Sequence, residues 1–174
     1  MHTPNFLHLK LFSHIWTSYG IICYKYTQLM KISTEYMVSK IHKEMTGAIL
    51  EFVRQEYTGP DNQKWMVMVD GCPDWHPPPA VKGHRPDLYI QSKYSKVTII
   101  GEAKTENDLM TPRSKNQIGG FIDYLVEREG QSIFILCVAL NQVSNARYLI
   151  RSNEPVKRIT THLIDRSKYD HLHA

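Results

Sequence analysis

The sequence is poor in cysteine, and its cysteines do not form a pattern that would staple a fold. Cys23, Cys72 and Cys137 are odd in number and widely spaced, with no CxxC pair. This spacing argues against a disulfide framework and a zinc knuckle, and it predicts reduced thiols in a cytoplasmic protein. Cys137 lies in the apolar run IFILCVAL, where we expect it to pack as a core residue.

Long hydrophobic runs are also missing. The most apolar N-terminal stretch, residues 6–26, is interrupted by Lys10 and His14 and falls short of the about 18 apolar residues that a membrane span needs. It has no clean signal-peptide core or cleavage site, so we expect no membrane partner. We interpret residues 1–36 as an N-terminal extension, helical or poorly ordered, or as sequence upstream of a start at Met37. Residues 37–174 are then one domain.

A strong excess of one charge is absent as well. The net charge is +4, and it falls to +2 without residues 1–36, which hold three lysines and one glutamate. This balance permits a polyanionic partner without requiring one. A content of 42% hydrophobic and 22% charged residues excludes wholesale disorder, and 174 residues suit a single α/β domain.

Hydrophobic periodicity predicts the elements of such a domain. Apolar residues recur with helical spacing over residues 38–57, and the run KWMVMVDG predicts a buried strand over residues 64–70, with Met66 and Met68 in the core. The proline-dense residues 72–86 must form a loop, which is either a substrate-facing lid or a passive crossover. DLYIQ and KVTIIGEAK read as two strands joined by the turn SKYS.

The second half of the chain continues as alternating helices and strands. A helix is expected from about Ser114 to Arg128, followed by the wholly apolar strand SIFILCVAL, a helix over residues 143–151 and a last strand, KRITTHLID. A continuous apolar strand is typical of a sheet covered on both faces. The order is therefore αβββαβ followed by αβ, which predicts an α/β fold with a central mixed sheet flanked by helices.

The strand TIIGEAK raises a chemical question, because it runs from β-branched residues into opposite charges. Glu102 and Lys104 share one face of this strand, with Ala103 on the other. The two charges could form a salt bridge, a solvated edge or a catalytic pair. If strand 87–91 pairs with it, Asp87 converges on the same place. Two carboxylates suit Mg²⁺, and a nearby lysine can orient or deprotonate water or hold a phosphate, as in metal-assisted phosphodiester hydrolysis.

The residues RPD, followed by GEAK, resemble the motif of the PD-(D/E)xK nuclease superfamily, which has a restriction-endonuclease-like fold with an αβββαβ core. The resemblance covers about residues 38–140. It implies that Asp87 and Glu102 bind the metal and that Lys104 is the catalytic lysine. Two further PD dipeptides, at residues 60–61 and 73–74, lie in turns with no strand immediately after them.

The same resemblance implies roles for residues on two helices. Many members carry a glutamate on the first helix, where Glu44 stands here, although Glu51 or a solvated helix edge fits equally well. Resolvase-like members carry a polar residue on the later helix, where Gln117 stands, but SKNQ also reads as a capping box with Ser114 at the N-cap. Arg113 and Lys115 are candidate nucleic-acid contacts near a helix N-terminus, or ordinary solvated charges.

We therefore expect a nuclease that hydrolyses DNA with Mg²⁺ or Mn²⁺, with an endonuclease favoured over an exonuclease and RNA left open as a substrate. Enzymes of this kind commonly form dimers, so the resemblance also implies that this protein forms a homodimer. The alternatives are a catalytically silent nuclease-fold protein that binds nucleic acid or a protein, and an unrelated α/β binding protein in which GEAK is a loop. All three motif positions are filled, which argues against a catalytically silent protein.

Overall fold

The computed structural model describes residues 40–58, 64–92, 94–153, 156 and 158–168. The chain divides into two units, residues 1–40 and 41–174, and the fold below is that of the second. The predicted extension over residues 1–36 lies outside the described residues. None of the described helices is long and apolar enough to span a membrane.

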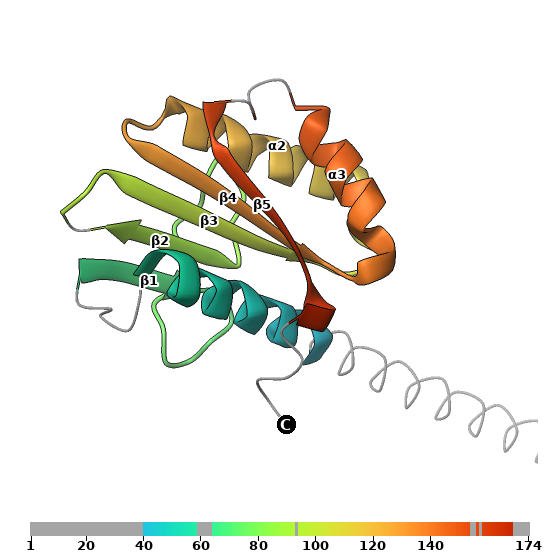
Figure 1. Cartoon of the computed structure of the whole chain (residues 1–174), viewed down its shortest axis with the longest axis horizontal. Coiled ribbons are helices and arrows are strands. Elements are labelled where there is room, and N and C mark those ends of the chain that lie inside the picture. Colours follow the sequence, from blue (N-terminus) through green and yellow to red (C-terminus); the bar gives the residue numbers. More distant parts are fainter. Residues whose placement is uncertain (1–39, 59–63, 93, 154–155, 157, 169–174) are drawn as a thin grey trace, which may run out of the picture. The chain divides into compact units, whose positions relative to one another are not determined.

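The domain is a three-layer α/β fold around one mixed sheet (Figure 1). A first helix covers residues 40–53 and ends in a π-helical turn, Arg54–Thr58. The sheet contains β1 (Trp65–Val69), β2 (Leu88–Ser92), β3 (Val97–Lys104), β4 (Gln131–Val138) and β5 (Thr160–Asp165). Helix α2 (Pro112–Glu127) connects β3 to β4, and α3 (Val143–Arg151) follows a 3₁₀ turn, Leu140–Gln142. The predicted α/β class and element order are confirmed.

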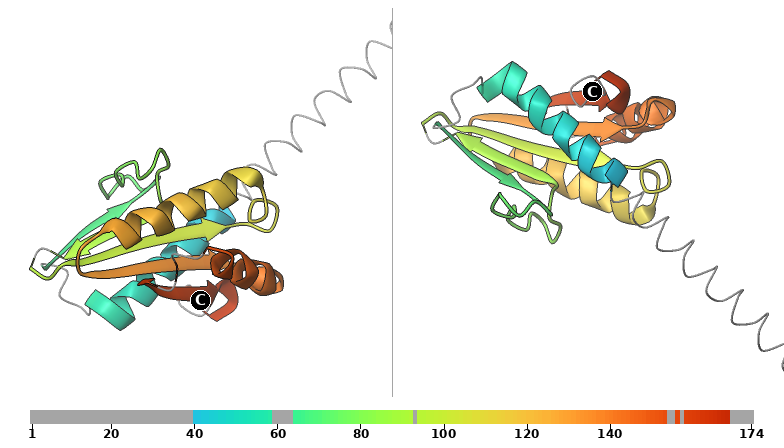
Figure 2. Two further views of the ribbon diagram at one scale, coloured as in Figure 1. Left: turned by 90° about the horizontal axis from the view of Figure 1, so that it is seen from above. Right: turned by 90° about the horizontal axis from the view of Figure 1, so that it is seen from below.

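The five strands lie in sequence order, β1-β2-β3-β4-β5. The first three pair antiparallel, and β4 and β5 add in parallel, as their helical crossovers require. The first helix packs on one face of the sheet, and α2 and α3 pack on the other (Figures 1 and 2). Strand β4 is apolar throughout because both of its faces are covered: Ile133 and Ile135 face the first helix, whereas Phe134 and Leu136 face α2 and α3.

Strand β1 differs from the prediction of a buried strand. It is the outer strand beside β2, and Val69 is the one residue of the strand that is buried, whereas Met66 is 37% exposed. The predicted core position of Met66 is therefore wrong, because β1 has a neighbouring strand on one side alone. Periodicity alone does not distinguish an edge strand from a central one.

The proline-dense segment between β1 and β2 is attached to the rest of the fold at several points. The N–H of Val69 donates to the carbonyl of His76 at 3.0 Å. Val81 is buried and forms a β-bridge with His84 across a tight turn in which both central residues, Lys82 and Gly83, have positive φ. This turn rests on α2 at Gly120, where an added Cβ would lie 3.2 Å from the Cβ of Lys82.

Candidate active site

Two carboxylates meet where β2 begins and β3 ends. Leu88 pairs with Gly101 in the antiparallel register, so Asp87, one residue before β2, comes beside Glu102. The Asp87 N–H donates to Glu102 Oε2 at 3.3 Å, and the Ala103 N–H donates to Asp87 Oδ2 at 2.7 Å. The structure therefore brings together the two carboxylates that the sequence pattern singled out.

Lys104 joins this pair from the same face of β3. Its Nζ lies 2.6 Å from Glu102 Oε1, and the two side chains are 12% and 2% exposed. A solvated strand edge is thus excluded as the explanation for the two charges. Lys104 Nζ also donates to Gln117 Oε1 at 2.8 Å. An ammonium group has three N–H donors, so one remains for a further ligand.

Gln117 occupies a different local position from the predicted capping box. Helix α2 begins at Pro112, and its N-cap is Thr111, whose side chain accepts a hydrogen bond from the Ser114 N–H. The predicted N-cap at Ser114 is therefore wrong, because Pro112 takes the first helical position and the N-cap lies three residues earlier, at Thr111. Gln117 does not cap; its Nε2 donates to the Arg85 carbonyl at 3.4 Å and its Oε1 accepts from Lys104.

Asp87 and Glu102 are two carboxyl groups placed close together in a buried environment. Burial, and then the nearby Asp87 carboxylate, raise the pKa of Glu102 to about 8, against the opposing effect of Lys104. A carboxyl group in this environment gains from any additional positive charge placed beside it. The arrangement has the property expected of a cation-binding or catalytic site.

His42, on the first helix, also belongs to the cluster around Asp87 and Glu102, and it was not predicted from the sequence. Its Nε2 lies 3.2 Å from Asp87 Oδ2. The hydrogen bond to Asp87 raises the pKa of His42, and burial opposes this shift. The available signal was that His42 flanks the apolar stripe of the helix and lies next to Ile41, in the first turn.

Glu44 and Glu51, the two glutamates considered on the first helix, have other partners. Glu44 Oε2 binds Arg166 Nη2 at 2.5 Å, and Glu51 binds Arg54 and Gln55 further along the chain. No contact between described residues connects either glutamate to Asp87 or Glu102. Metal binding by Glu44 stays a prediction.

The first turns of α2 carry the two basic residues predicted to contact nucleic acid. Arg113 and Lys115 are exposed, and within the described part of the chain neither has a carboxylate at ion-pair distance. They stand on the helix that supplies Gln117, and the loop leading to that helix follows Lys104 directly. Within this loop, Thr105 Oγ1 donates to Asp108 at 2.6 Å.

The two carboxylates suit Mg²⁺, which takes part of its ligand shell from water, better than a metal ion whose ligands all come from the protein. In the described ranges, no group of three or more His, Cys, Asp and Glu side chains is arranged to hold a metal ion. Mg²⁺ usually binds one or two carboxylates and completes its shell with water and substrate phosphate. Asp87 and Glu102 provide that number of carboxylates.

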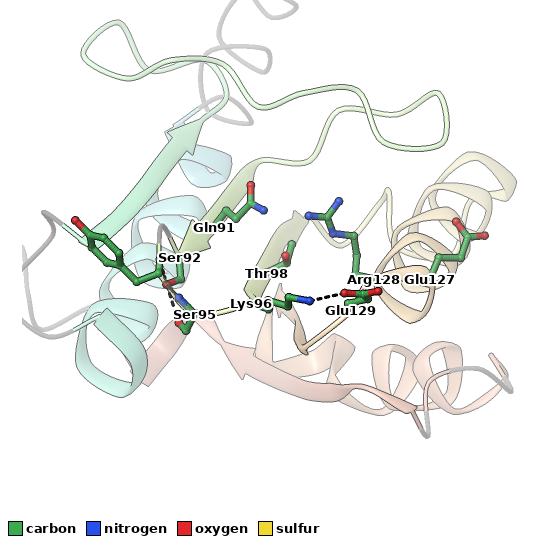
Figure 3. Close-up of a pocket in the computed structure, with 9 residues that line it drawn as sticks. Gln91, Ser92, Ser95, Lys96, Thr98, Glu127, Arg128 and Glu129 are labelled. Atoms are coloured by element: carbon green, nitrogen blue, oxygen red, sulfur yellow. Dashed lines mark hydrogen bonds and ion pairs between the residues drawn. The ribbon is translucent and has the colours of Figure 1, made fainter.

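A separate polar pocket lies at the opposite end of the sheet (Figure 3). It has a volume of about 420 Å³ and is formed by the β2–β3 turn and the end of α2, where Lys96 pairs with Glu129. Residues of both charges line it, and none of the clustered carboxylates reaches it. Its position sets it apart from Asp87 and Glu102.

Comparisons with family models, with curated proteins and with solved structures found no significant match.

Proposed function

We propose that this protein is a Mg²⁺-dependent nuclease that hydrolyses phosphodiester bonds in DNA, and that its sheet and helices form a restriction-endonuclease-like core. The observation that carries the proposal is the convergence of Asp87, Glu102 and Lys104 where β2 begins and β3 ends. The resemblance to PD-(D/E)xK nucleases and the αβββαβ order around a mixed sheet support it.

Asp87 and Glu102 would hold the metal. Asp87 is oriented by the Ala103 N–H and by His42, and Glu102 by the Asp87 N–H and Lys104. These four contacts fix both carboxylates before a ligand arrives, so little reorganisation is needed on binding. When bound, Mg²⁺ supplies Lewis acidity toward the phosphate and lowers the pKa of a coordinated water.

Lys104 would position the reacting groups. Glu102 and Gln117 hold its ammonium group from two sides, which leaves one N–H to donate to a phosphate oxygen or to the attacking water. Gln117 in turn donates to the carbonyl of Arg85, so it ties Lys104 to the segment that leads into Asp87. Gln117 is thus a positioning residue in this scheme, and Arg113 and Lys115 on the same helix would contact the phosphates beside the cut.

The test is cleavage of supercoiled plasmid, branched DNA, single-stranded DNA and RNA, with Mg²⁺, Mn²⁺ or EDTA. We expect the wild-type protein to cut DNA with either metal and Glu102→Ala to be inactive. Glu129→Ala is the matched control, because it removes an exposed carboxylate at the far end of the domain. Cleavage that persists in Glu102→Ala, or in EDTA, would overturn the proposal. Cleavage of RNA alone would overturn the assignment to DNA and leave the chemistry standing.

The silent alternative predicts a different result from the same proteins. A binding module that retains the motif would bind nucleic acid and cut none of these substrates, whatever the metal. Titration calorimetry with Mg²⁺ separates the remaining cases, because an unrelated α/β binding protein would bind no metal at Asp87 and Glu102.

A further inference from the structure

Some basic residues of the described surface pair with a carboxylate, and others do not. Several basic residues bind a neighbouring carboxylate: Arg54 with Glu51, Lys82 with Glu127, Arg85 with Asp70, Lys96 with Glu129 and Arg166 with Glu44. In contrast, among the described residues no carboxylate lies at ion-pair distance from Arg113, Lys115, Arg147 or Arg151. These four residues belong to α2 and α3. Within the described ranges the same holds for Lys40, Lys43, Arg128 and Arg158, which lie outside these two helices.

The sequence explains why the basic residues of α2 and α3 have no carboxylate beside them. Residues 109–122 and 130–153 contain neither aspartate nor glutamate, and these segments form the first part of α2, strand β4, the 3₁₀ turn and all of α3. Positive charges on their surface are therefore not neutralised locally, and their field extends into solvent. Such a surface attracts a polyanion, whereas a surface of paired charges does not.

Helix α3 adds an aromatic side chain to this field. Ala146, Leu149 and Ile150 face the core, and the opposite side exposes what we term the α3 surface: Ser144, Asn145, Arg147, Tyr148 and Arg151. Tyr148 is 67% exposed and stands next to Arg147 in sequence. Arg147 and Arg151 are one turn apart, about 6 Å along the helix axis.

The α3 surface begins near the candidate active site. Asn141, in the 3₁₀ turn that leads into α3, donates to Glu106 at 2.7 Å, and Glu106 lies in the loop immediately after Lys104. Strands β3 and β4 are parallel, so their C-terminal ends, which lead to this loop and to this turn, lie at the same edge of the sheet. A strand of nucleic acid leaving the carboxylates can thus continue along α3, which lies beside α2 (Figure 1).

We infer that the α3 surface binds a single-stranded segment of the nucleic-acid substrate, with Arg147 and Arg151 contacting phosphates and Tyr148 stacking on an unpaired base. The inference rests on the proposed function and narrows its substrate class to nucleic acid with an unpaired region. Basic residues interleaved with an exposed aromatic ring are the combination that binds single strands without reading their sequence. A continuous duplex offers no unstacked base to Tyr148.

The test measures binding without cleavage, by fluorescence anisotropy of labelled single-stranded and duplex oligonucleotides in EDTA at several salt concentrations. Removing two phosphate contacts in Arg147→Ala/Arg151→Ala should reduce the slope of log K against log salt by about 1.4 for single strands. The matched control, Arg54→Ala/Lys96→Ala, changes the net charge equally but removes paired residues, and it should leave the slope nearly unchanged. Tyr148→Ala should lower single-strand affinity by about five-fold or more, and Tyr148→Phe should restore it.

Equal losses in the α3 and control variants would overturn the inference, as would a Tyr148→Ala effect of the same size on duplex. A change in the sedimenting mass of the protein alone in the α3 variant, with binding intact, would assign the surface to a second copy of the chain and also overturn it. The proposed function is judged separately. Metal-dependent cleavage lost in Glu102→Ala supports the nuclease even if α3 plays no part, and α3-dependent binding without cleavage supports the surface alone.

Discussion

His42 Nε2 lies 3.2 Å from Asp87 Oδ2, and this contact connects the first helix to the carboxylate pair on the sheet. It joins residues 45 positions apart. Asp87 Oδ2 also accepts the Ala103 N–H, so one oxygen of the proposed metal ligand is held from two directions. The first helix therefore contacts the carboxylate pair through His42, whereas the family resemblance implied a contribution from Glu44.

We expect His42→Ala to weaken Mg²⁺ binding and cleavage by about 10–100-fold, the usual loss when a group that orients a metal ligand is removed. His42→Gln, which can still donate to Asp87, should recover part of it. Glu44→Ala is the comparison on the same helix, because Glu44 binds Arg166. Mg²⁺ titration calorimetry decides between them. A larger loss in Glu44→Ala than in His42→Ala would restore the glutamate as the residue that supports the metal.

Lys104→Met should abolish cleavage, because no other described side chain holds an ammonium group beside Glu102. The same change removes the cation that lowers the pKa of Glu102, so at pH 9 the variant keeps on this carboxyl a proton that the wild type has released, and the free energy of unfolding should fall by about 1 kcal/mol through this group. At pH 6 Glu102 keeps its proton and the loss should be much smaller. Urea unfolding at both pH values measures this. An equal loss at pH 6 and pH 9 would contradict the assignment of the charge to Glu102.

The raised pKa of Glu102 predicts how stability depends on pH without metal. The folded state holds this proton up to about pH 8, whereas the ordinary pKa, which the unfolded chain should show, is 4.5. Between these values the folded state binds more protons, so its stability should fall as pH rises. The contribution is complete below about pH 4.5 and lost through pH 8. His42, with its raised pKa, acts in the same direction above about 6.5.

The measurement is the free energy of unfolding in EDTA from pH 5 to 9, for the wild type and for Glu102→Gln. The difference between the two proteins isolates the Glu102 contribution from that of His42 and other groups. A difference that does not change across this range would show that Glu102 titrates normally.

Gly101→Ala should destabilise the domain by about 1–3 kcal/mol through overpacking. The added Cβ would lie 2.6 Å from Ile49 Cγ2, so the first helix would have to move away from the sheet. Gly47→Ala is the control, because a Cβ there meets nothing within 4 Å and alanine in a helix interior favours stability by about 0.5–1 kcal/mol. Thermal unfolding should separate the two variants in opposite directions. Equal stability would mean that Ile49 yields easily.

The order of helices and strands followed from periodicity because each central element buries a regular stripe or face. Strand β4 shows this, since its apolar run predicted a strand covered on both sides. The exposure of Met66 did not follow, because the position of a strand at the edge is set by pairing and not by its own residues.

The site was predictable to the extent that its residues are local to two neighbouring strands. Asp87 and Glu102 are 15 residues apart in one hairpin, so spacing and strand pairing were sufficient to bring them together. His42 reaches Asp87 through the docking of a helix on the sheet, which no short-range pattern encodes. The N-cap at Thr111 had a local signal in the sequence, because the proline after it is typical of the first helical position, but the capping-box pattern at Ser114 pointed elsewhere.

The attachment of the proline-dense segment bears on how quickly a substrate can be bound. Val81 is buried, the turn at Lys82 rests on α2, and the Arg85 carbonyl is bonded to Gln117, so the segment is held at three points shortly before Asp87. These contacts favour the passive crossover over the substrate-facing lid. Binding then needs no closing step, and in stopped-flow experiments the observed association rate should increase linearly with substrate concentration, without the plateau that a conformational change imposes.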